Sequence, residues 1–290
     1  MTARPGQHGR VAVNTAGVSG GRRRPRTGFA FLDAGRDEGA VLAFAHRGGA
    51  RHPEVEGLEN TLVAFEHAVG LGYSYLETDV HATRDGVLLA FHDDVLDRVT
   101  ASAGSILERS YVDVRTALIG GREPIPRMAD LLEHFPGVRF NIDLKSDTAV
   151  EPLLELVEHT GAHDRVCVGA FSERRLRAFR RGVSRPVATS FGPVGVGLSR
   201  FAPRRLAESV LAGGGEAFQV PARHRGMQIV TPAFVERAHR AGRPVHVWTV
   251  DDRAQMATLL DLGVDGLITD RTDVLREVLM DRGQWLERTS

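Results

Sequence analysis

The sequence predicts an α/β protein folded as a single (β/α)₈ barrel of the TIM type, and three observations lead to that prediction. From about residue 41 onward, short apolar runs rich in β-branched residues alternate with amphipathic stretches. Such strict alternation indicates a parallel sheet. Eight strand runs within about 245 residues match the length of a closed barrel. A doubly wound open sheet is the alternative, but no dinucleotide fingerprint or P-loop opens any of the helices.

The predicted strands are short apolar runs bounded by turn-forming residues. They cover residues 41–45, 75–80, 139–144, 166–171, 186–191, 217–221, 244–250 and 266–269, and the second continues through a turn at 84–86 into 87–91. The predicted helices show apolar residues on one face, as Leu62, Phe65 and Val69 do in the first. They cover residues 59–70, 127–134, 149–160, 173–181, 204–212, 232–241, 254–262 and 273–280.

Two segments lie outside this regular alternation. Residues 1–38 are rich in Gly and Arg and lack apolar periodicity, so we expect a disordered tail before a single barrel domain at 39–290. Residues 94–126 form a short cap-like connection after the second strand, which we expect to cover the barrel mouth. The tail has no apolar stretch of the length that an export signal needs, so we expect a cytoplasmic protein.

Composition excludes several classes of protein. The 290 residues carry 37 basic and 37 acidic side chains, and this balance argues against a nucleic-acid binder. A single cysteine, Cys167, rules out a disulfide framework. No apolar run is long enough for stable membrane insertion. The sequence leaves the oligomeric state open. Of the 37 basic residues only Lys145 is a lysine, which suggests that its position needs an ammonium group.

Charged residues gather where the predicted strands end, the edge at which barrel enzymes carry their active sites. Glu77 and Asp79 are two residues apart on one strand, so both carboxylates project from one face. Asp143 and Lys145 have the same spacing. Three carboxylates at one mouth require a cation, and their oxygen ligands favour Mg²⁺ or Ca²⁺.

Four further residues extend this predicted site. Arg47 would act with the lysine to bind a phosphate beside the metal. His46 and His92 follow neighbouring strand segments and suit a general base and a general acid near neutral pH. Trp248, at the end of a later strand, is either barrel filler or a wall of the pocket.

Taken together, an ordered set of motifs resembles the glycerophosphodiester phosphodiesterase family over about residues 42 to 280. The motifs are His46-Arg47-Gly48, Glu59-Asn60-Thr61, Glu77-x-Asp79, Asp85-Gly86, His92-Asp93, Asn141-Ile142-Asp143-Leu144-Lys145, Trp248-Thr249 and Asp265-Gly266-Leu267-Ile268-Thr269-Asp270. The resemblance implies a (β/α)₈ barrel that uses one divalent cation to hydrolyse small glycerophosphodiesters to glycerol 3-phosphate and an alcohol.

The resemblance also implies roles for individual residues. It assigns His46 and His92 as the acid–base pair, Glu77 and Asp79 as metal ligands, Arg47 and Lys145 as phosphate-binding cations, and Glu59 as a supporting residue near Arg47. The family usually has Glu where this chain has Asp143, so this carboxylate reaches about one methylene less far toward a metal. The short connection weakly favours small, soluble diesters.

Other readings of the sequence remain open. A lysophospholipase D or a cyclising phospholipase would act on lipid phosphodiesters and would need an apolar rim, for which the connection 94–126 offers Ile106, Tyr111 and Ile119. A non-catalytic barrel that senses phosphodiesters would not require both histidines. A metal-dependent aldolase or isomerase shares only the fold, and a fold alone does not determine function.

Overall fold

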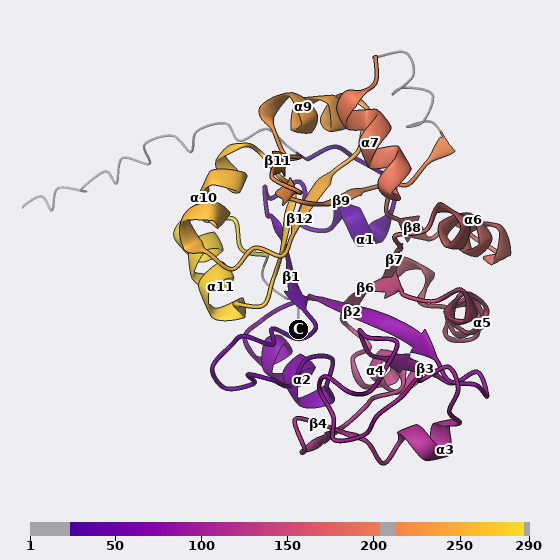
Figure 1. Ribbon diagram of the computed structural model, residues 1–290. Coiled ribbons are helices and arrows are strands. Elements are labelled where there is room, and N and C mark those ends of the chain that lie inside the picture. The colour runs from indigo at the N-terminus through magenta and orange to yellow at the C-terminus, as the bar shows by residue number, and fades with distance from the viewer. Residues whose placement is uncertain (1–23, 204–212, 287–290) are drawn as a thin grey trace, which may run out of the picture.

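A computed structural model describes residues 24–203 and 213–286 and shows a parallel barrel surrounded by helices (Figure 1). The eight parallel strands are β1 (Leu42–His46), β2 (Tyr75–Ala82), β6 (Arg139–Leu144), β7 (Val166–Gly169), β8 (Ala188–Thr189), β9 (Phe218–Pro221), β12 (Val245–Trp248) and β13 (Gly266–Thr269). Their order in the sheet is β8-β7-β6-β2-β1-β13-β12-β9. The predicted strand ranges match these strands, with the largest differences at the short β8.

The ring closes between the two outer strands of this order. Ser190, directly after β8, forms a parallel bridge with Ala217, directly before β9. The Phe191 amide donates to the Ala217 carbonyl at 3.0 Å, and the Glu216 amide donates to the Thr189 carbonyl at 2.8 Å. The predicted closed barrel is therefore confirmed, and the open doubly wound sheet is excluded.

The helices surround the strands, with α2 and α4 on one side and α7 and α9 on the opposite side (Figure 1). Those of at least seven residues are α2 (Leu62–Gly70), α4 (Met128–His134), α5 (Val150–Thr160), α6 (Glu173–Gly182), α7 (Pro193–Phe201), α9 (Pro232–Arg240), α10 (Arg253–Asp261) and α11 (Thr272–Asp281). Short 3₁₀ turns, η1 (Asp147–Ala149) and η2 (Ala162–Asp164), flank α5.

Local sequence explains where these helices begin and end. The Thr61 hydroxyl accepts from the Ala64 amide at the start of α2, and Thr231 caps α9 in the same way. Gly161 ends α5 in the left-handed conformation, which costs glycine little. The helix predicted at 204–212 lies outside the described residues. Helix α7 was not predicted, because its proline and two glycines resemble a loop.

The segment before β1 corrects the expected boundary of the disordered tail at residue 38. Residues 24–38 include α1 (Ala30–Asp33), and its Phe31 and Leu32 are almost fully buried. Phe31 meets the Tyr75 ring edge-on at 5.1 Å, and the Tyr75 hydroxyl donates to the Phe31 carbonyl. This segment thus closes the barrel interior at the end opposite the strand termini that carry the site. Residues 1–23 lie outside the described residues.

The connection after the second strand also differs from expectation. The run predicted as a continuation of β2 is β3 (Leu88–Ala90), which folds back antiparallel to β2. Residues 94–126 contain α3 (Tyr111–Val114), β4 (Leu118–Ile119) and β5 (Glu123–Pro124). Ile106 and Ile119 are buried with Leu89 and Phe91 in a separate small core. The connection therefore packs beside the barrel on its own core.

Candidate active site

A pocket of about 640 Å³ opens at the carboxyl ends of the barrel strands. One side is polar and is lined by residues in or shortly after β1, β2, β3 and β6. The other side is mainly apolar and comes from residues in or after β7, β8, β9 and β12, and it also includes Arg200 and His224. His224 belongs to β10 (Arg223–His224), which forms a hairpin with β11 (Met227–Gln228). No residue of 94–126, all of which the structure describes, lines this pocket, so the connection does not cover the mouth as expected.

Strand register brings the predicted acidic residues together. Asp79 of β2 lies opposite Asp143 of β6, and Glu77 lies opposite Asn141. The side chains of Glu77 and Asp79 are almost fully buried and point into the pocket. The two-residue spacing that the sequence analysis noted therefore places the carboxylates on the inner face of the barrel.

A tight turn after β1 positions Arg47. Its backbone is left-handed, with φ of 50°, and its amide donates to the Glu77 side chain at 3.2 Å. Gly48 follows with φ of 87°, and a Cβ there would lie 2.7 Å from the Ala64 Cβ, so only glycine fits. The turn holds the Arg47 guanidinium over the pocket, where its Nε lies 2.9 Å from Asp79 Oδ2.

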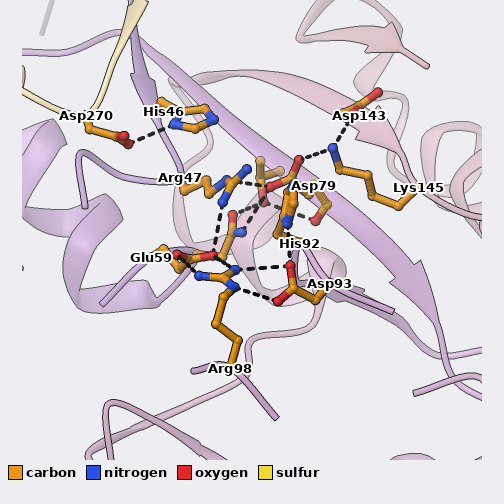
Figure 2. A network of polar contacts seen from close by, with 12 residues as sticks. His46, Arg47, Glu59, Asp79, His92, Asp93, Arg98, Asp143, Lys145 and Asp270 are labelled. Carbon is orange, nitrogen blue, oxygen red and sulfur yellow. Dashed lines mark hydrogen bonds and ion pairs between the residues drawn. The ribbon is translucent and has the colours of Figure 1, made fainter. Parts of the chain in front are cut away.

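Lys145 lies between two carboxylates, as Figure 2 shows. Its Nζ is 2.8 Å from Asp79 Oδ1 and 2.6 Å from Asp143 Oδ2. The ammonium also lies 5.9 Å from the centre of the Phe171 ring. Asp79 thus contacts both Arg47 and Lys145, and the two cations flank it inside the pocket.

His46 and His92 line the pocket, and each has a carboxylate at Nδ1. His46 Nδ1 lies 2.8 Å from Asp270 Oδ1, and His92 Nδ1 lies 2.5 Å from Asp93 Oδ1 (Figure 2). A carboxylate at one ring nitrogen fixes the tautomer and leaves the other nitrogen to exchange a proton. His46 Nε2 is 3.8 Å from Glu77 Oε2. The arrangement provides two oriented imidazoles in one cavity.

The charges of the site shift its pKa values in opposite directions. Burial raises the pKa of Glu77 well above its ordinary value, and the neighbouring charge of Asp79 adds to the rise. Burial would also raise the pKa of Asp79, but Lys145 and Arg47 outweigh it and lower the pKa. For His46, burial would lower the pKa, yet Glu77 and Asp270 together raise it.

The remaining predicted residues also lie at the site. Glu59, expected to lie near Arg47, accepts a hydrogen bond from the Arg47 guanidinium at 3.2 Å. Trp248 lines the pocket and meets the Phe171 ring at 5.7 Å, so it is a pocket wall. His246, in contrast, is fully buried beneath the pocket against Phe44.

Several residues that take part in this network had been given no role. Asp93 and Asp270 hold the histidines, and Arg98 contacts Glu59 and Asp93. Asn60, left-handed at φ of 58°, donates to Asp79 and accepts from Thr78. The adjacency of Asp93 to His92 is the one signal in the sequence that could have indicated such a role.

The oxygen donors of Glu77, Asp79 and Asp143 fit a hard divalent cation by their chemistry. Glu77 is a buried carboxyl whose pKa is raised by burial and by the charge of Asp79, and a cation beside it would favour its ionised form. Within the described ranges, however, no three acidic, His or Cys side chains converge as a metal cluster. Lys145 occupies the space between two of the three donors.

Comparison with known proteins places this geometry in a family. The model of the glycerophosphoryl diester phosphodiesterase family matches residues 46–274. The Mycobacterium tuberculosis protein named "Probable glycerophosphodiester phosphodiesterase 2" is 43% identical over 253 residues, which cover 85% of this chain and 94% of the relative. A lysophospholipase D of Rattus norvegicus is 25% identical over 279 residues, covering 81% of this chain and 85% of the relative.

A solved structure shows the same fold. The Oleispira antarctica phosphodiesterase in complex with the product sn-glycerol-3-phosphate superposes with a TM-score of 0.71 at 19% identity, covering 83% of this chain and 97% of that chain. Along the described parts of the chain, no helix is both long and apolar enough to cross a lipid bilayer. The chain belongs to the glycerophosphodiester phosphodiesterase family and is a phosphoric diester hydrolase.

Proposed function

We propose that this protein hydrolyses glycerophosphodiesters to sn-glycerol 3-phosphate and an alcohol, with His46 and His92 as the acid–base pair. The observation that carries the proposal is the pair of imidazoles, each held by a carboxylate, in one pocket with Arg47 and Lys145. The sn-glycerol-3-phosphate bound to the Oleispira antarctica protein supports the choice of product.

Arg47 and Lys145 are the phosphate-binding groups in this proposal. Both line the pocket, and both remain charged at neutral pH because the carboxylates around them raise their pKa values against the effect of burial. When a phosphodiester binds here, its oxygens replace some of the contacts that Arg47 and Lys145 make with Asp79. The two cations then stabilise the negative charge that develops on the phosphoryl oxygens.

The two histidines move the protons of the reaction. One imidazole accepts a proton from the attacking hydroxyl, and the other donates a proton to the oxygen of the leaving alcohol. Asp270 and Asp93 stabilise whichever imidazole becomes charged, because each carboxylate accepts a hydrogen bond from Nδ1. The attacking group is either water or the 2-hydroxyl of the substrate glycerol, which would give a cyclic phosphate first.

Glu77, Asp79 and Asp143 would hold one divalent cation, Mg²⁺ or Ca²⁺, in the same proposal. When bound, such a cation supplies Lewis-acid stabilisation of the phosphoryl oxygens. The buried Glu77 would then be ionised, since a neighbouring cation lowers the pKa that burial raises. Lys145 would keep only part of its contacts with Asp79 and Asp143.

A panel of glycerophosphodiesters, assayed for glycerol 3-phosphate with Mg²⁺, Ca²⁺ or Mn²⁺, tests this function. We expect turnover that EDTA abolishes and that one of the metals restores. His46→Ala and His92→Ala should each lower turnover by about 10²–10⁴, the range for loss of acid–base catalysis. His134→Ala is the control, because His134 pairs with Glu66 outside the pocket. Full activity in either site variant contradicts its role.

A second substrate class is favoured by the apolar side of the pocket. Phe171 and Phe201 line it and remain 64% and 58% exposed, and Val196 also lines it while packing against the main core. This wall could receive the acyl chain of a lysophospholipid, the substrate class named by the rat relative. The buried apolar residues of 94–126 do not supply that rim.

Comparison of lysophosphatidylcholine with glycerophosphocholine separates the two classes. If lysophospholipids are substrates, Phe201→Ser should lower kcat/KM for the lysophospholipid and leave glycerophosphocholine turnover unchanged. Met280→Ser, on the outer face of α11, controls for the loss of an exposed apolar side chain. No turnover of the lysophospholipid by the parent enzyme restricts the function to small diesters.

A further inference from the structure

Arg98 joins two carboxylates at the edge of the pocket (Figure 2). It belongs to the connection after β3, and its guanidinium uses all three nitrogens. Nη1 and Nη2 donate to the two oxygens of Glu59 at 2.8 and 2.6 Å. Nε donates to Asp93 Oδ2 at 2.6 Å, and Nη2 also reaches Asp93 Oδ1 at 3.2 Å. Such paired contacts restrict both carboxylates in position and in orientation.

Each of these carboxylates also contacts one functional side chain of the pocket. Glu59 Oε1 accepts from Arg47 at 3.2 Å, and Asp93 Oδ1 contacts His92 Nδ1 at 2.5 Å. The five side chains thus form a continuous series from Arg47 to His92, with basic and acidic groups in alternation. Arg98 lies at its centre, and no residue of 94–126 lines the pocket itself.

We infer that Arg98 is a positioning residue that sets the phosphate-binding Arg47 and the proton-transferring His92 in one fixed arrangement. The inference rests on the proposed function, because it concerns how two of its groups are oriented. Arg98 does not contact the reacting atoms; it acts through Glu59 and Asp93. The connection after β3 thereby contributes to catalysis although it does not cover the mouth.

Charge explains why a guanidinium is needed at this place. Its hydrogen bonds to Asp93 lower the pKa of that carboxyl to about 2. Burial would raise the pKa of Glu59, but Arg98 and Arg47 outweigh it and lower the pKa. Both carboxylates are therefore ionised at neutral pH, and without Arg98 each would keep a single partner, Arg47 for Glu59 and His92 for Asp93. Glu59 would then be free to draw the Arg47 side chain away from the phosphate position.

A purely structural role is the competing explanation, and exposure argues against it. The Arg98 side chain is 46% exposed, so its truncation opens no cavity in a packed core. The small core of the connection contains Leu96 and Ile106 but not Arg98. Loss of the guanidinium should therefore change the geometry of the site while the fold stays intact.

The test uses the full chain and glycerophosphodiester turnover. We expect Arg98→Ala to lower kcat/KM by about 10–100-fold, the range for loss of a group that orients catalytic side chains. KM should rise because Arg47 no longer holds its phosphate-binding position, and kcat should fall because His92 loses its fixed orientation. Arg98→Lys should be intermediate, because an ammonium cannot bridge both carboxylates at once. Millimolar guanidinium chloride should partly restore Arg98→Ala.

Two further variants identify the route of the effect. Arg109→Gln is the matched control: Arg109 lies in the same connection and donates to the Ala103 carbonyl. It should retain the parent activity. In the background of Glu59→Gln, removal of Arg98 should cost less than in the parent, because the two residues act as one unit.

The outcomes distinguish this inference from the proposed function. If the parent turns over none of the diesters, the proposed function fails. If the parent is active and folded Arg98→Ala stays within about threefold of it, the positioning role is wrong. If Arg98→Ala lowers the melting temperature together with the activity, and neither guanidinium nor Arg98→Lys restores them, the inference is also wrong and Arg98 has a structural role.

Discussion

Lys145 shows how much a single position can constrain its residue type. Its ammonium lies within 2.8 Å of both Asp79 and Asp143, and the Phe171 ring limits the space on another side. An ammonium is a compact charge on a flexible stem, whereas a guanidinium is a wide planar group. The chain uses Arg at its 36 other basic positions, so composition alone would favour Arg here too.

We therefore expect Lys145→Arg to lower turnover by about 10²–10³, comparable to the loss of one preorganised donor to the transition state. The melting temperature should stay nearly constant. Steady-state kinetics on the purified variant, with calorimetry to confirm folding, measure this. Arg109→Lys makes the reverse exchange away from the pocket and should be neutral. Activity of Lys145→Arg within threefold of the parent would show that the lysine is not required.

His246 represents a different kind of buried residue. It is fully buried against Phe44, and neither ring nitrogen has a hydrogen-bond partner among the described residues. Burial lowers the pKa of His246 to about 3. The unfolded chain binds a proton at this residue below about pH 6.5, whereas the folded chain does not until about pH 3.

This difference makes the folded state sensitive to acid. The contribution of His246 is fully present above about pH 6.5 and is lost as the pH falls toward 3, by up to a few kcal/mol. His246→Leu should flatten the decline of the unfolding free energy between pH 7.5 and 5. Urea denaturation at both pH values measures it, with His134→Leu as an exposed control. Parallel declines in parent and His246→Leu would refute the assignment.

The site residues that could be predicted are those fixed by strand geometry. Glu77 and Asp79 share a face because side chains alternate along any strand, and β2 and β6 are regular. Arg98 and Asp270 could not be found in this way. Their contacts cross from loops to residues far away in sequence, and no local periodicity encodes such contacts. Glu59 was identified through the family motif and not through spacing.

At the scale of elements, the segment around α1 depends on tertiary contacts. Four residues cannot form a stable helix alone, and α1 has no side-chain cap. Phe31 and Leu32 hold it by packing against Phe44 and Tyr75 inside the barrel. A run of four apolar residues within a Gly- and Arg-rich stretch gives no periodic signal, and this explains why the sequence analysis assigned it to a tail.

We expect Phe31→Ala to lower the free energy of unfolding by about 3–5 kcal/mol, the usual cost of truncating a buried aromatic residue. The cavity would open at the closed end of the barrel, away from the pocket, so KM should change little. Thermal and urea denaturation give the stability, and Phe201→Ala serves as an exposed control of the same residue type. An unchanged melting temperature would mean that the segment is not packed in solution.

Longer elements were predicted because their patterns repeat. Helices α5, α9 and α11 each show several turns of apolar periodicity, and β6 and β13 match the predicted bounds. The two exceptions have different causes, close packing for α7 and a local turn for β3. In α7, a Cβ on Gly195 would lie 2.9 Å from the Phe191 ring, so glycine serves close packing there and not a loop. β3 reverses direction because of the turn at Asp85 and Gly86.

The barrel closes at the contact between β8 and β9, where a single bridge joins Ser190 and Ala217. Gly215 lies beside this contact, where a Cβ would be 2.4 Å from the backbone carbon of Ser190. The backbone cannot yield there without separating the bridge between Ser190 and Ala217. The alternation of strands and helices predicts eight units. It cannot show that β8 and β9 are joined by so few hydrogen bonds.

Gly215→Ala should therefore destabilise the protein by about 1–3 kcal/mol, as overpacking typically does. Amide hydrogen exchange should rise first in β8 and β9, because their shared contact opens before the rest of the barrel. Gly213→Ala is the matched control, since a Cβ there meets no atom within 4 Å. Equal stability of the two variants would show that the contact accommodates a methyl group.

The bond between His46 and Asp270 also has a consequence for synthesis. The two residues are 224 positions apart, on β1 and directly after β13. During translation β1 emerges early and β13 among the last elements, so the imidazole has no orienting partner until nearly the whole polypeptide has left the ribosome. Contacts of such long sequence separation form later than local helices do. Under the proposed function we therefore expect turnover to appear only when β13 and Asp270 have joined the barrel, so that acquisition of turnover reports the completion of folding itself.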